Sequence, residues 1–290
     1  MTARSQRRVA TVTPPRIDLR RVWRLMVYVI LIAAAVFYII PVYLLFMTGL
    51  KGFAEAANQS LMWQLPQAAN FGSFEEAWKA ISPNFVNSVR IAVPAAVLSS
   101  IVGSINGYVL AKWRFRGSET LFTLVLFGMF IPYQSILIPL LKLETLTGLY
   151  GSIEGLIIVH IIYGIPITTL IFRNYYVAIP DELIEASKVD GATFFGIYRH
   201  ILLPLSAPGF VVVLIWQFTS AWNDFLFAVT LTKQSSWPIT VAVNNLAGSF
   251  EVAWNVQMAG ALIAAIPTLL IYVLLGRYFM RGLLAGSLKG

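Results

Sequence analysis

The sequence contains no cysteine, and only 12% of its 290 residues are charged. The lack of cysteine excludes a disulfide framework and a thiolate metal site. Soluble domains carry about 25% charged residues, so the low charge, together with 58% hydrophobic residues, excludes an ordinary soluble domain. The net charge of +8 is compatible with nucleic-acid binding, but basic residues in cytoplasmic loops explain it better. We therefore expect one polytopic membrane domain and no nucleic-acid partner.

Signatures of catalysis are also missing. No segment matches G-x-x-x-x-G-K-[ST], so the chain lacks the phosphate-cradling loop that would power transport. Neither a cluster of metal ligands nor a nucleophile elbow occurs, and the first apolar run is too long for a cleaved signal peptide. These absences predict a chain that is not an enzyme and that binds no cofactor itself.

Six apolar segments without charge are long enough to cross a bilayer, which takes about 20 residues. They are residues 25–50, 91–111, 120–141, 155–172, 205–223 and 252–276. Prolines inside these segments are tolerated, because neighbouring helices can satisfy the freed backbone groups. The pattern predicts an all-α polytopic membrane protein with six transmembrane helices and both termini on one side.

The distribution of lysine and arginine gives the orientation. Residues 1–24 hold seven of them, and residues 112–119, 173–203 and 277–290 hold three each, which places 16 of the 21 on one side. Because such a bias marks the cytoplasmic side, we expect both termini inside. The expected parts are a basic segment 1–24, a six-span domain 25–276 with outward loops 51–89 and 233–251 and an inward insert 176–204, and a cytoplasmic tail 277–290.

The first outward loop is expected to contain a short helix. Ser73 can cap this helix, and Glu76, three residues later, completes a capping box. The helix can serve to dock an outside partner, or it can lie at the membrane surface with Phe74 and Trp78 among the lipid headgroups. The second interpretation is the simpler one.

The second span carries small residues at a strict spacing of four. They are Ala95, Ser99, Gly103 and Gly107. Such a stripe lets another helix approach closely, so it predicts helix packing and not a ligand site.

Polar residues within the spans are few. Asp224 is the only acid near a span, fewer than a proton-coupled carrier normally needs. His160 stands alone, so a hydrogen-bonded packing role is expected for it. The residues that can hydrogen-bond either a polar solute or another helix, and so are candidates for a solute path, are Gln134, Gln217, Asn223 and Asp224.

The insert has a pattern of its own, with five charges within residues 181–190. Pro180 suits the start of a helix, and acidic residues favour its first turn. Glu185 and Lys188 are spaced for an ion pair, and Gly191 readily ends the helix in the left-handed conformation. A small pair, Ala186-Ser187, permits close docking.

A second amphipathic stretch follows and ends at Pro204. It carries three aromatic rings, Phe194, Phe195 and Tyr198, which we expect to be exposed. A solvated connecting loop would not need them. The insert is therefore predicted to be a helix–turn–helix that a partner grips from the cytoplasm.

The insert resembles the inner-membrane permease subunits of ATP-binding-cassette (ABC) importers. In that family Glu-Ala-Ala is followed three residues later by Gly and then by Leu-Pro. The matching residues here are Glu185-Ala186-Ser187, Asp190-Gly191-Ala192 and Leu203-Pro204. Ser187 replaces the second alanine, which is a small-for-small change that should leave docking intact.

Other segments resemble the carbohydrate branch of the family and its maltose-type permeases. They are Asn87-Ser88, residues 112–117, Ile131-Pro132, residues 222–225 and residues 281–290. The resemblance covers nearly the whole chain after residue 25 and implies a sugar as the solute, closest to glucose or a small glucoside. A peptide or a polyol stays open from the residues alone.

The resemblance implies a cytoplasmic coupling helix that sits in a cleft of an ATPase subunit. The residues matched to it are Glu182, Glu185, Ala186, Ser187, Asp190, Gly191, Ala192, Tyr198, Leu203 and Pro204. It also implies a loop that reaches into an external solute-binding protein, with the tip Asn244, Asn245, Leu246, Ala247 and Gly248. The tail is implied to contact the ATPases through Gly282, Gly286 and Gly290.

The implied partners are a second permease subunit, two copies of an ATPase that hold ATP and Mg, a solute-binding protein, the sugar and the lipid bilayer. Closure of the ATPase pair would drive alternating access around a midplane site. In maltose-type systems the sugar site lies mostly in the companion permease, so polar residues in these spans need not touch solute.

Two hypotheses from other classes compete with this one. An ATP-independent secondary carrier or channel is the alternative, and it would work from this chain alone with more charged residues in the spans. A membrane scaffold would recruit cytoplasmic proteins through the same insert. Loss of solute uptake on deletion would separate transport from scaffolding.

Overall fold

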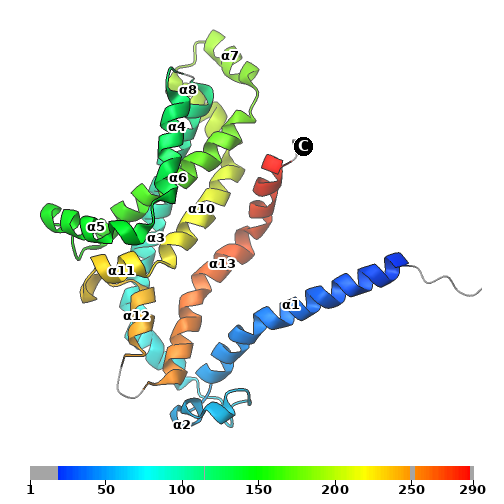
Figure 1. The fold of residues 1–290 in the computed structure, drawn as a ribbon, viewed down its shortest axis with the longest axis vertical. Coiled ribbons are helices and arrows are strands. Elements are labelled where there is room, and N and C mark those ends of the chain that lie inside the picture. The colour runs from blue at the N-terminus through cyan, green and yellow to red at the C-terminus, as the bar shows by residue number, and fades with distance from the viewer. Residues whose placement is uncertain (1–18, 114, 249–251, 288–290) are drawn as a thin grey trace, which may run out of the picture. The chain divides into compact units, whose positions relative to one another are not determined.

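The computed structural model describes residues 19–113, 115–248 and 252–287, with the backbone alone for residues 277–287. Every regular element in these ranges is helical, apart from one isolated parallel bridge between Gly151 and Thr232. The α-helices are α1 (Leu19–Gly49), α2 (Phe53–Ala57), α3 (Gly72–Lys112), α4 (Ser118–Phe127), α5 (Tyr133–Thr147), α6 (Ile153–Val177), α7 (Asp181–Val189), α8 (Phe194–Ile197), α9 (Leu203–Leu205), α10 (Ala207–Trp222), α11 (Leu226–Leu231), α12 (Ile239–Asn245) and α13 (Trp254–Ser287) (Figure 1). The predicted all-α class is confirmed.

The chain divides into two compact units, residues 1–45 and 46–290. In the first unit the described residues belong to the single helix α1, which contains Pro41. The segment Arg20–Gly49 is long enough to cross a membrane and contains an 18-residue stretch with a mean hydropathy of 2.7. It contains nearly all of the predicted first span, 25–50.

The second unit is built around the paired helices α3 and α6, which share the most extensive helix–helix interface in the described part of the chain. Gly103 and Gly107 face α6 so closely that a Cβ atom at Gly103 would collide with Thr168, and one at Gly107 would lie 2.7 Å from the backbone nitrogen of Arg173. Helices α10 and α13 pack on α3 as well. The prediction that the small-residue stripe serves helix packing is confirmed.

The helices that could span a membrane include both continuous and broken ones. In the described residues four helices, α1, α3, α6 and α13, are long and apolar enough to span. Two helix pairs pass the same test together but are bent, so the number of candidate spans is four to six. At 41 residues α3 is about 60 Å long, roughly twice the thickness of the hydrocarbon core, so it extends beyond the membrane.

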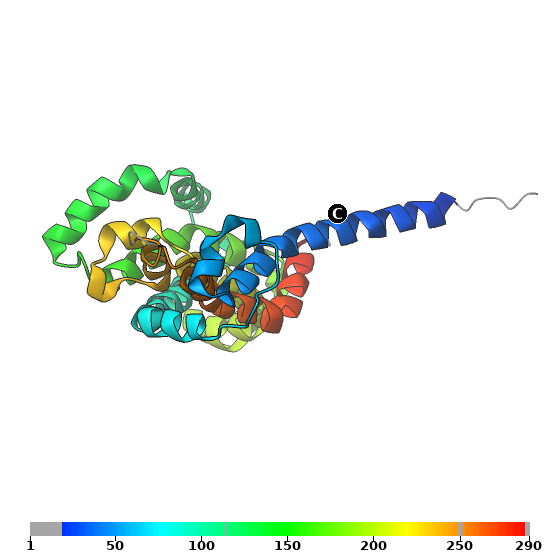
Figure 2. The same ribbon diagram turned by 90° about the horizontal axis from the view of Figure 1, so that it is seen from below.

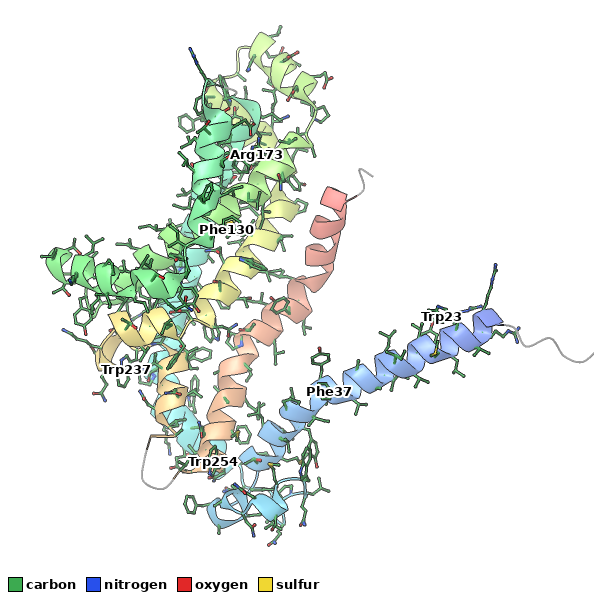
Figure 3. The ribbon with its side chains drawn as sticks, viewed as in Figure 1. Trp23, Phe37, Phe130, Arg173, Trp237 and Trp254 are labelled. Atoms are coloured by element: carbon green, nitrogen blue, oxygen red, sulfur yellow. The ribbon has the colours of Figure 1, made fainter. Side chains whose placement is uncertain are left out.

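The predicted third span, 120–141, is not one continuous helix. Ser118–Phe130 and Tyr133–Thr147 meet at 95°, and α5 extends away from the bundle of α3, α6, α10 and α13 (Figures 1 and 2). Phe130 lies at this bend (Figure 3). Ile131 is extended, as expected for a residue before proline, and Pro132 is the N-cap of α5.

The fifth predicted span, 205–223, is also bent at its start. Phe194–Leu205 meets Ala207–Trp222 at 77°, and Pro204 lies inside the short helix α9 instead of ending the helical stretch.

Arg173 of α6 ties α4 to the bundle: its guanidinium lies 2.6 Å from Glu119 and 4.1 Å from the ring centroid of Phe122 (Figure 3).

The expected short helix in the loop 51–89 is instead the first part of α3, which begins at Gly72. Ser73 does not cap it: the N-cap is Phe71, and the hydroxyl of Ser73 accepts a hydrogen bond from Asn255 of α13 at 2.9 Å. Of the two rings expected among the lipid headgroups, Phe74 packs in a cluster with α13 residues, whereas Trp78 is exposed. In the segment before α3, the ammonium of the buried Lys51 donates a hydrogen bond to the carbonyl of Leu61 at 2.6 Å.

Candidate functional site

The insert 176–204 folds as the predicted helix–turn–helix, with α7 followed by a tight turn and by the stretch α8 to α9. Asp181 and Glu182 lie in the first turn of α7, where the positive end of the helix dipole favours acidic side chains. Ile184 and Ser187 are buried, and Ile184 belongs to the hydrophobic cluster that includes Tyr176 of α6. One side of α7 is thus fixed on the membrane helices.

The turn after α7 depends on Gly191, whose φ of +80° lies in the left-handed region that glycine adopts without strain. The N–H of Gly191 donates to the carbonyl of Lys188 at 3.1 Å, and the N–H of Ala192 donates to that of Ser187 at 2.9 Å. Thr193 then caps α8, because its hydroxyl accepts from the N–H of Gly196. The predicted helix break at Asp190-Gly191 is confirmed.

The aromatic rings of the insert mostly face inward, contrary to the prediction that all three are exposed. Phe194 and Tyr198 both stack on the buried ring of Tyr108 in α3, with centroids 4.7 and 5.8 Å away. The hydroxyl of Tyr198 lies 3.0 Å from that of Ser104. Only Phe195 of the three is open to the surroundings, at 69% exposure. The aromatic pattern therefore marks attachment of the insert to α3.

The opposite side of α7 is exposed, and Phe195 of α8 is exposed as well. The exposed residues, here called the α7 surface, are Glu182, Leu183, Glu185, Ala186, Val189, Asp190 and Phe195. Val189 is the most exposed of the large apolar side chains in the described residues, at 88%. Ser187 faces away from this surface, and its hydroxyl donates to the carbonyl of Leu183 at 2.6 Å. Of the small pair Ala186-Ser187, only Ala186 is therefore exposed for docking.

Basic residues anchor α7 to the end of α3. The buried ammonium of Lys112 donates to the carbonyl of Ile179 at 2.6 Å and pairs with Asp181. The ammonium of Lys188 lies 4.5 Å from the ring centroid of Trp113, an arrangement that favours a cation–π interaction. The predicted Glu185–Lys188 pair is absent from the ion pairs of the described residues.

A cavity of about 610 Å³ lies between α5, α6, α10 and α11. Its polar lining residues are Tyr133, His160, Tyr163, Gln217, Ser220, Asn223 and Asp224. Trp216, Phe225 and Phe227 add aromatic surface. Its volume falls in the range of small-molecule sites, and its mixture of aromatic walls with a few polar groups is typical of them.

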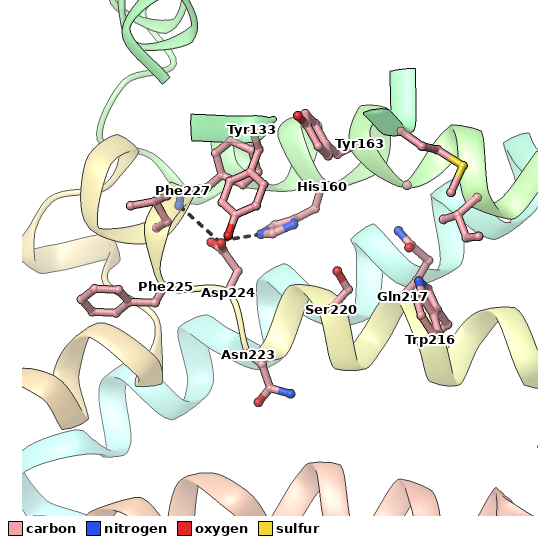
Figure 4. Close-up of a pocket in the computed structure, with 14 residues that line it drawn as sticks. Tyr133, His160, Tyr163, Trp216, Gln217, Ser220, Asn223, Asp224, Phe225 and Phe227 are labelled. Atoms are coloured by element: carbon pink, nitrogen blue, oxygen red, sulfur yellow. Dashed lines mark hydrogen bonds and ion pairs between the residues drawn. The ribbon is translucent and has the colours of Figure 1, made fainter. Parts of the chain in front are cut away.

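Asp224 lines this cavity and is held in place by hydrogen bonds (Figure 4). Its carboxylate accepts hydrogen bonds from the backbone N–H groups of Phe227 at 3.3 Å and Ala228 at 2.9 Å, so it satisfies two free N–H groups in the first turn of α11, whose N-cap is Phe225. Its backbone carbonyl accepts from the hydroxyl of Thr240 in α12 at 2.6 Å. The residue thereby joins α10, α11 and α12 and holds its charge at the cavity wall.

The sequence suggested that His160 stands alone, but the structure places it beside Asp224. Its Nε2 atom is 3.6 Å from Oδ2 of Asp224, beyond hydrogen-bond distance, and has no hydrogen-bond partner among the described residues. The ring meets that of Phe227 edge-on, with centroids 6.1 Å apart. Sequence reasoning missed this pair because 64 positions separate the two residues, and only the fold of α6 against α11 brings them together.

The structure brings three of the four candidate solute-path residues to this cavity, namely Gln217, Asn223 and Asp224. Gln217 is buried and lies directly over Gly164, which has no side chain to displace it. Gln134 is exposed on α5 and does not line the cavity.

A second cavity of about 450 Å³ lies between α10, α12 and α13. Asn223 and Phe225 line both cavities, so the segment 222–225 separates them. Figure 4 shows the Asn223 side chain on the opposite side of the chain from Asp224. Asn244 lines this second cavity.

The predicted loop tip 244–248 is only partly a loop, because its first two residues are the last two of α12. Asn244 and Asn245 are exposed at the end of α12, whereas Leu246 packs against Gly260 of α13. This region and the insert lie at opposite ends of the second unit (Figure 1).

The predicted tail from residue 277 is helical as far as it is described. Gly282 and Gly286 lie within α13, which runs to Ser287, while Gly290 lies outside the described residues. No metal-binding group of three or more His, Cys, Asp or Glu residues occurs in the described ranges.

Comparison with known proteins gives a consistent result. Residues 100–284 match the family described as the binding-protein-dependent transport system inner membrane component. The chain is 47% identical over 270 residues to a probable ABC transporter permease protein of Pyrococcus horikoshii, covering 92% of this chain and 98% of that protein. It is 34% identical to a xylose/arabinose import permease protein of Haloferax volcanii, covering 92% and 93%.

A solved structure has the same fold. It is a chain from a bacterial ABC transporter involved in the import of the acidic polysaccharide alginate, with a TM-score of 0.77 and 21% sequence identity. The match covers 92% of this chain and 100% of that chain.

Proposed function

Because this chain belongs to the family of binding-protein-dependent transport system inner membrane components, we propose that it is one of two permease subunits of an ABC importer for a sugar or small glycoside. The relative from Haloferax volcanii is a xylose/arabinose import permease, which supports a sugar as the solute. The sugar would enter the cytoplasm by alternating access, driven by a partner ATPase.

The observation that carries the proposal is the α7 surface. Its exposed residues include apolar Leu183, Val189 and Phe195 and acidic Glu182 and Glu185, and nothing in the described chain covers them. An exposed apolar patch with a polar rim is typical of a protein interaction site. A cleft of the ATPase is the proposed partner, and Gly191 sets the angle at which α7 meets it.

The route from this surface to the spans runs through packed side chains. Tyr108 and Ser104 of α3 contact Phe194 and Tyr198 of the insert, and Ile184 belongs to the same cluster. Closure of two ATPase copies around ATP and Mg would therefore move α7 together with the inner ends of α3 and α6. The chain itself would hydrolyse nothing.

The proposed orientation places α7 and both termini in the cytoplasm. Gly282, Gly286 and Gly290 would then lie on the side of the ATPases, where the tail contacts them. The end of α12, with Asn244, Asn245, Leu246, Ala247 and Gly248, would face an external solute-binding protein. The cavity lined by Gln217, Asn223 and Asp224 lies between these two ends and is the proposed part of the solute path in this subunit.

The test is purification of the chain from its native cells in mild detergent, followed by identification of co-purifying proteins. We expect a second multi-span permease and an ATPase in stoichiometric amounts. Recovery of the chain alone, or as a homo-oligomer, would reject the importer and favour a carrier or channel.

A pair of variants then tests the α7 surface. Glu185→Lys reverses a charge on the exposed side of α7 and should abolish sugar uptake while the protein stays in the membrane. Glu154→Lys is the matched control, because Glu154 is exposed in the first turn of α6, far from α7 in sequence. Full uptake by Glu185→Lys would contradict the docking role.

A further inference from the structure

The cavity around Asp224 holds a polar pair that the fold leaves incomplete. Nε2 of His160 is buried without a hydrogen-bond partner among the described residues, and the side chain is 7% exposed. The nearest carboxylate oxygen, Oδ2 of Asp224, is 3.6 Å away. A buried polar group without a partner costs stability, so its presence calls for a specific explanation.

Asp224 keeps unused acceptor capacity. A carboxylate offers about four lone-pair positions, and the N–H groups of Phe227 and Ala228 take two of them. Thr240 fixes the backbone of the same residue, so the carboxylate is pre-positioned. A ligand that bears hydroxyl groups could donate to Asp224 and accept from His160 at once, which would complete both.

The walls of the cavity fit such a ligand. Tyr133 and Tyr163 pack on Phe227, with ring centroids 5.5 and 5.3 Å from it, and all three rings line the cavity. Trp216 of α10 also lines the cavity, beside Gln217 (Figure 4). Aromatic rings can cover the C–H face of a sugar ring while the polar groups hydrogen-bond to its hydroxyls.

The charge of the cavity sets a limit on the ligand. None of the described residues that line it is Lys or Arg, and its ionisable side chains are Asp224, His160 and two tyrosines. An acidic sugar would therefore bring a second carboxylate close to Asp224 at low dielectric, where like charges repel strongly. A neutral sugar would meet no such repulsion.

We infer that this cavity is a solute subsite within this subunit, in which Asp224 and His160 bind hydroxyl groups of a neutral sugar and exclude acidic ones. The inference rests on the proposed importer function and adds a charge selectivity that resides in this chain. It also makes His160 a binding residue.

The test uses the complete membrane complex of both permeases and ATPase, purified without the solute-binding protein, so that the measured selectivity belongs to the membrane part. Equilibrium binding of xylose, arabinose and glucose is compared with binding of glucuronate. We expect at least one neutral sugar to bind about tenfold or more tightly than glucuronate, which corresponds to about 1.4 kcal/mol. Equal or tighter binding of glucuronate would overturn the inference.

Two variants assign the selectivity to this chain. His160→Leu removes the unpartnered nitrogen without breaking a hydrogen bond of the fold, and should weaken neutral-sugar binding about tenfold. Asp224→Asn should narrow the gap between neutral and acidic sugars. Glu154→Gln is the matched control, because it removes one exposed carboxylate from the same helix as His160 and should bind like the wild type.

The outcomes separate the inference from the proposed function. If the wild-type complex, supplied with its binding protein and ATP, imports sugar while His160→Leu and Asp224→Asn bind it unchanged, the importer stands and the subsite lies in the companion permease. If the wild type neither binds nor imports the three neutral sugars, the sugar-importer proposal itself fails. Co-elution of the companion permease and the ATPase with each variant, in the amounts found for the wild type, verifies that its complex is assembled.

Discussion

The ring of Tyr108 in α3 stacks on the ring of Phe194 at the start of α8, with centroids 4.7 Å apart and planes inclined by 27°. Tyr108 is fully buried, and its hydroxyl also lies 3.4 Å from the carbonyl oxygen of Phe194. The contact joins a membrane helix to the insert that bears the α7 surface. Any displacement of the insert must therefore move α3 or break this stack.

Replacing Tyr108 by alanine is expected to separate the insert from the membrane helices. Removal of a large buried aromatic side chain costs about 3–5 kcal/mol of unfolding free energy. In proteoliposomes that contain the complete importer, we expect ATP hydrolysis to continue while the number of sugar molecules imported per ATP falls. The measurement is the ratio of uptake to hydrolysis.

Tyr108→Phe is the control for this prediction, because it keeps the stacked ring and removes only a hydroxyl with a long hydrogen bond. Near wild-type uptake is expected for it. A Tyr108→Ala importer with an unchanged ratio would show that movement does not pass through the stack.

Gly191 gives a second prediction, which depends on backbone geometry alone. No atom lies within 4 Å of a Cβ placed there, so only its φ of +80° resists substitution. Gly191→Asn should keep most of the uptake, since asparagine tolerates the left-handed region. Gly191→Pro should abolish uptake while the protein stays in the membrane, because proline fixes φ near −65° and re-aims α7. Retained uptake in the proline variant would count against the coupling role.

Several of these local features could be predicted from the sequence. Gly191 and the acidic start of α7 identify a helix and its end through short-range backbone chemistry, and the spacing of Gly103 and Gly107 identifies a packing face. Such patterns act within one or two helical turns, so no knowledge of the fold is needed to interpret them.

Features that depend on long-range contacts were not readable. The apolar run 120–141 looks continuous, yet the chain turns by 95° at Ile131-Pro132, since hydropathy does not report direction. Neighbours Leu183 and Ile184 have similar side chains, and only the docking of α7 on the cluster around Tyr176 decides that Ile184 is buried. His160 and Asp224 meet for the same reason.

The third prediction concerns the contact of α3 with α6. A Cβ at Gly107 would lie 2.7 Å from both the backbone nitrogen of Arg173 and the Cβ of Phe172, and backbone cannot move aside as a flexible side chain can. Gly107→Ala should therefore destabilise the protein by about 1–3 kcal/mol, seen as a lower Tm in detergent. Gly276→Ala is the control, because no atom lies within 4 Å there and the Tm should not fall. Equal Tm values for the two variants would contradict the close approach.

The fourth prediction concerns the attachment of α12 to α3 at the end of the bundle opposite α7. The hydroxyl of Ser88 accepts a hydrogen bond from the backbone N–H of Ile239 at 2.7 Å, and both residues are buried. Asn87 adds hydrogen bonds from its amide to the carbonyls of Ser235 and Trp237 at 3.2 and 3.1 Å. These contacts hold the first turn of α12 in place.

Ser88→Ala would leave the buried N–H of Ile239 without an acceptor, which costs about 1–3 kcal/mol. The expected result is faster hydrogen exchange across α12 and a weaker response of ATP hydrolysis to the sugar-loaded binding protein. Ser235→Ala is the matched control, because Ser235 is exposed and offers only its carbonyl to this contact, which alanine retains. Hydrogen exchange is measured peptide by peptide, so it reports on α12 separately from transport. Equal protection of α12 in both variants would show that the hydroxyl of Ser88 does not hold the helix.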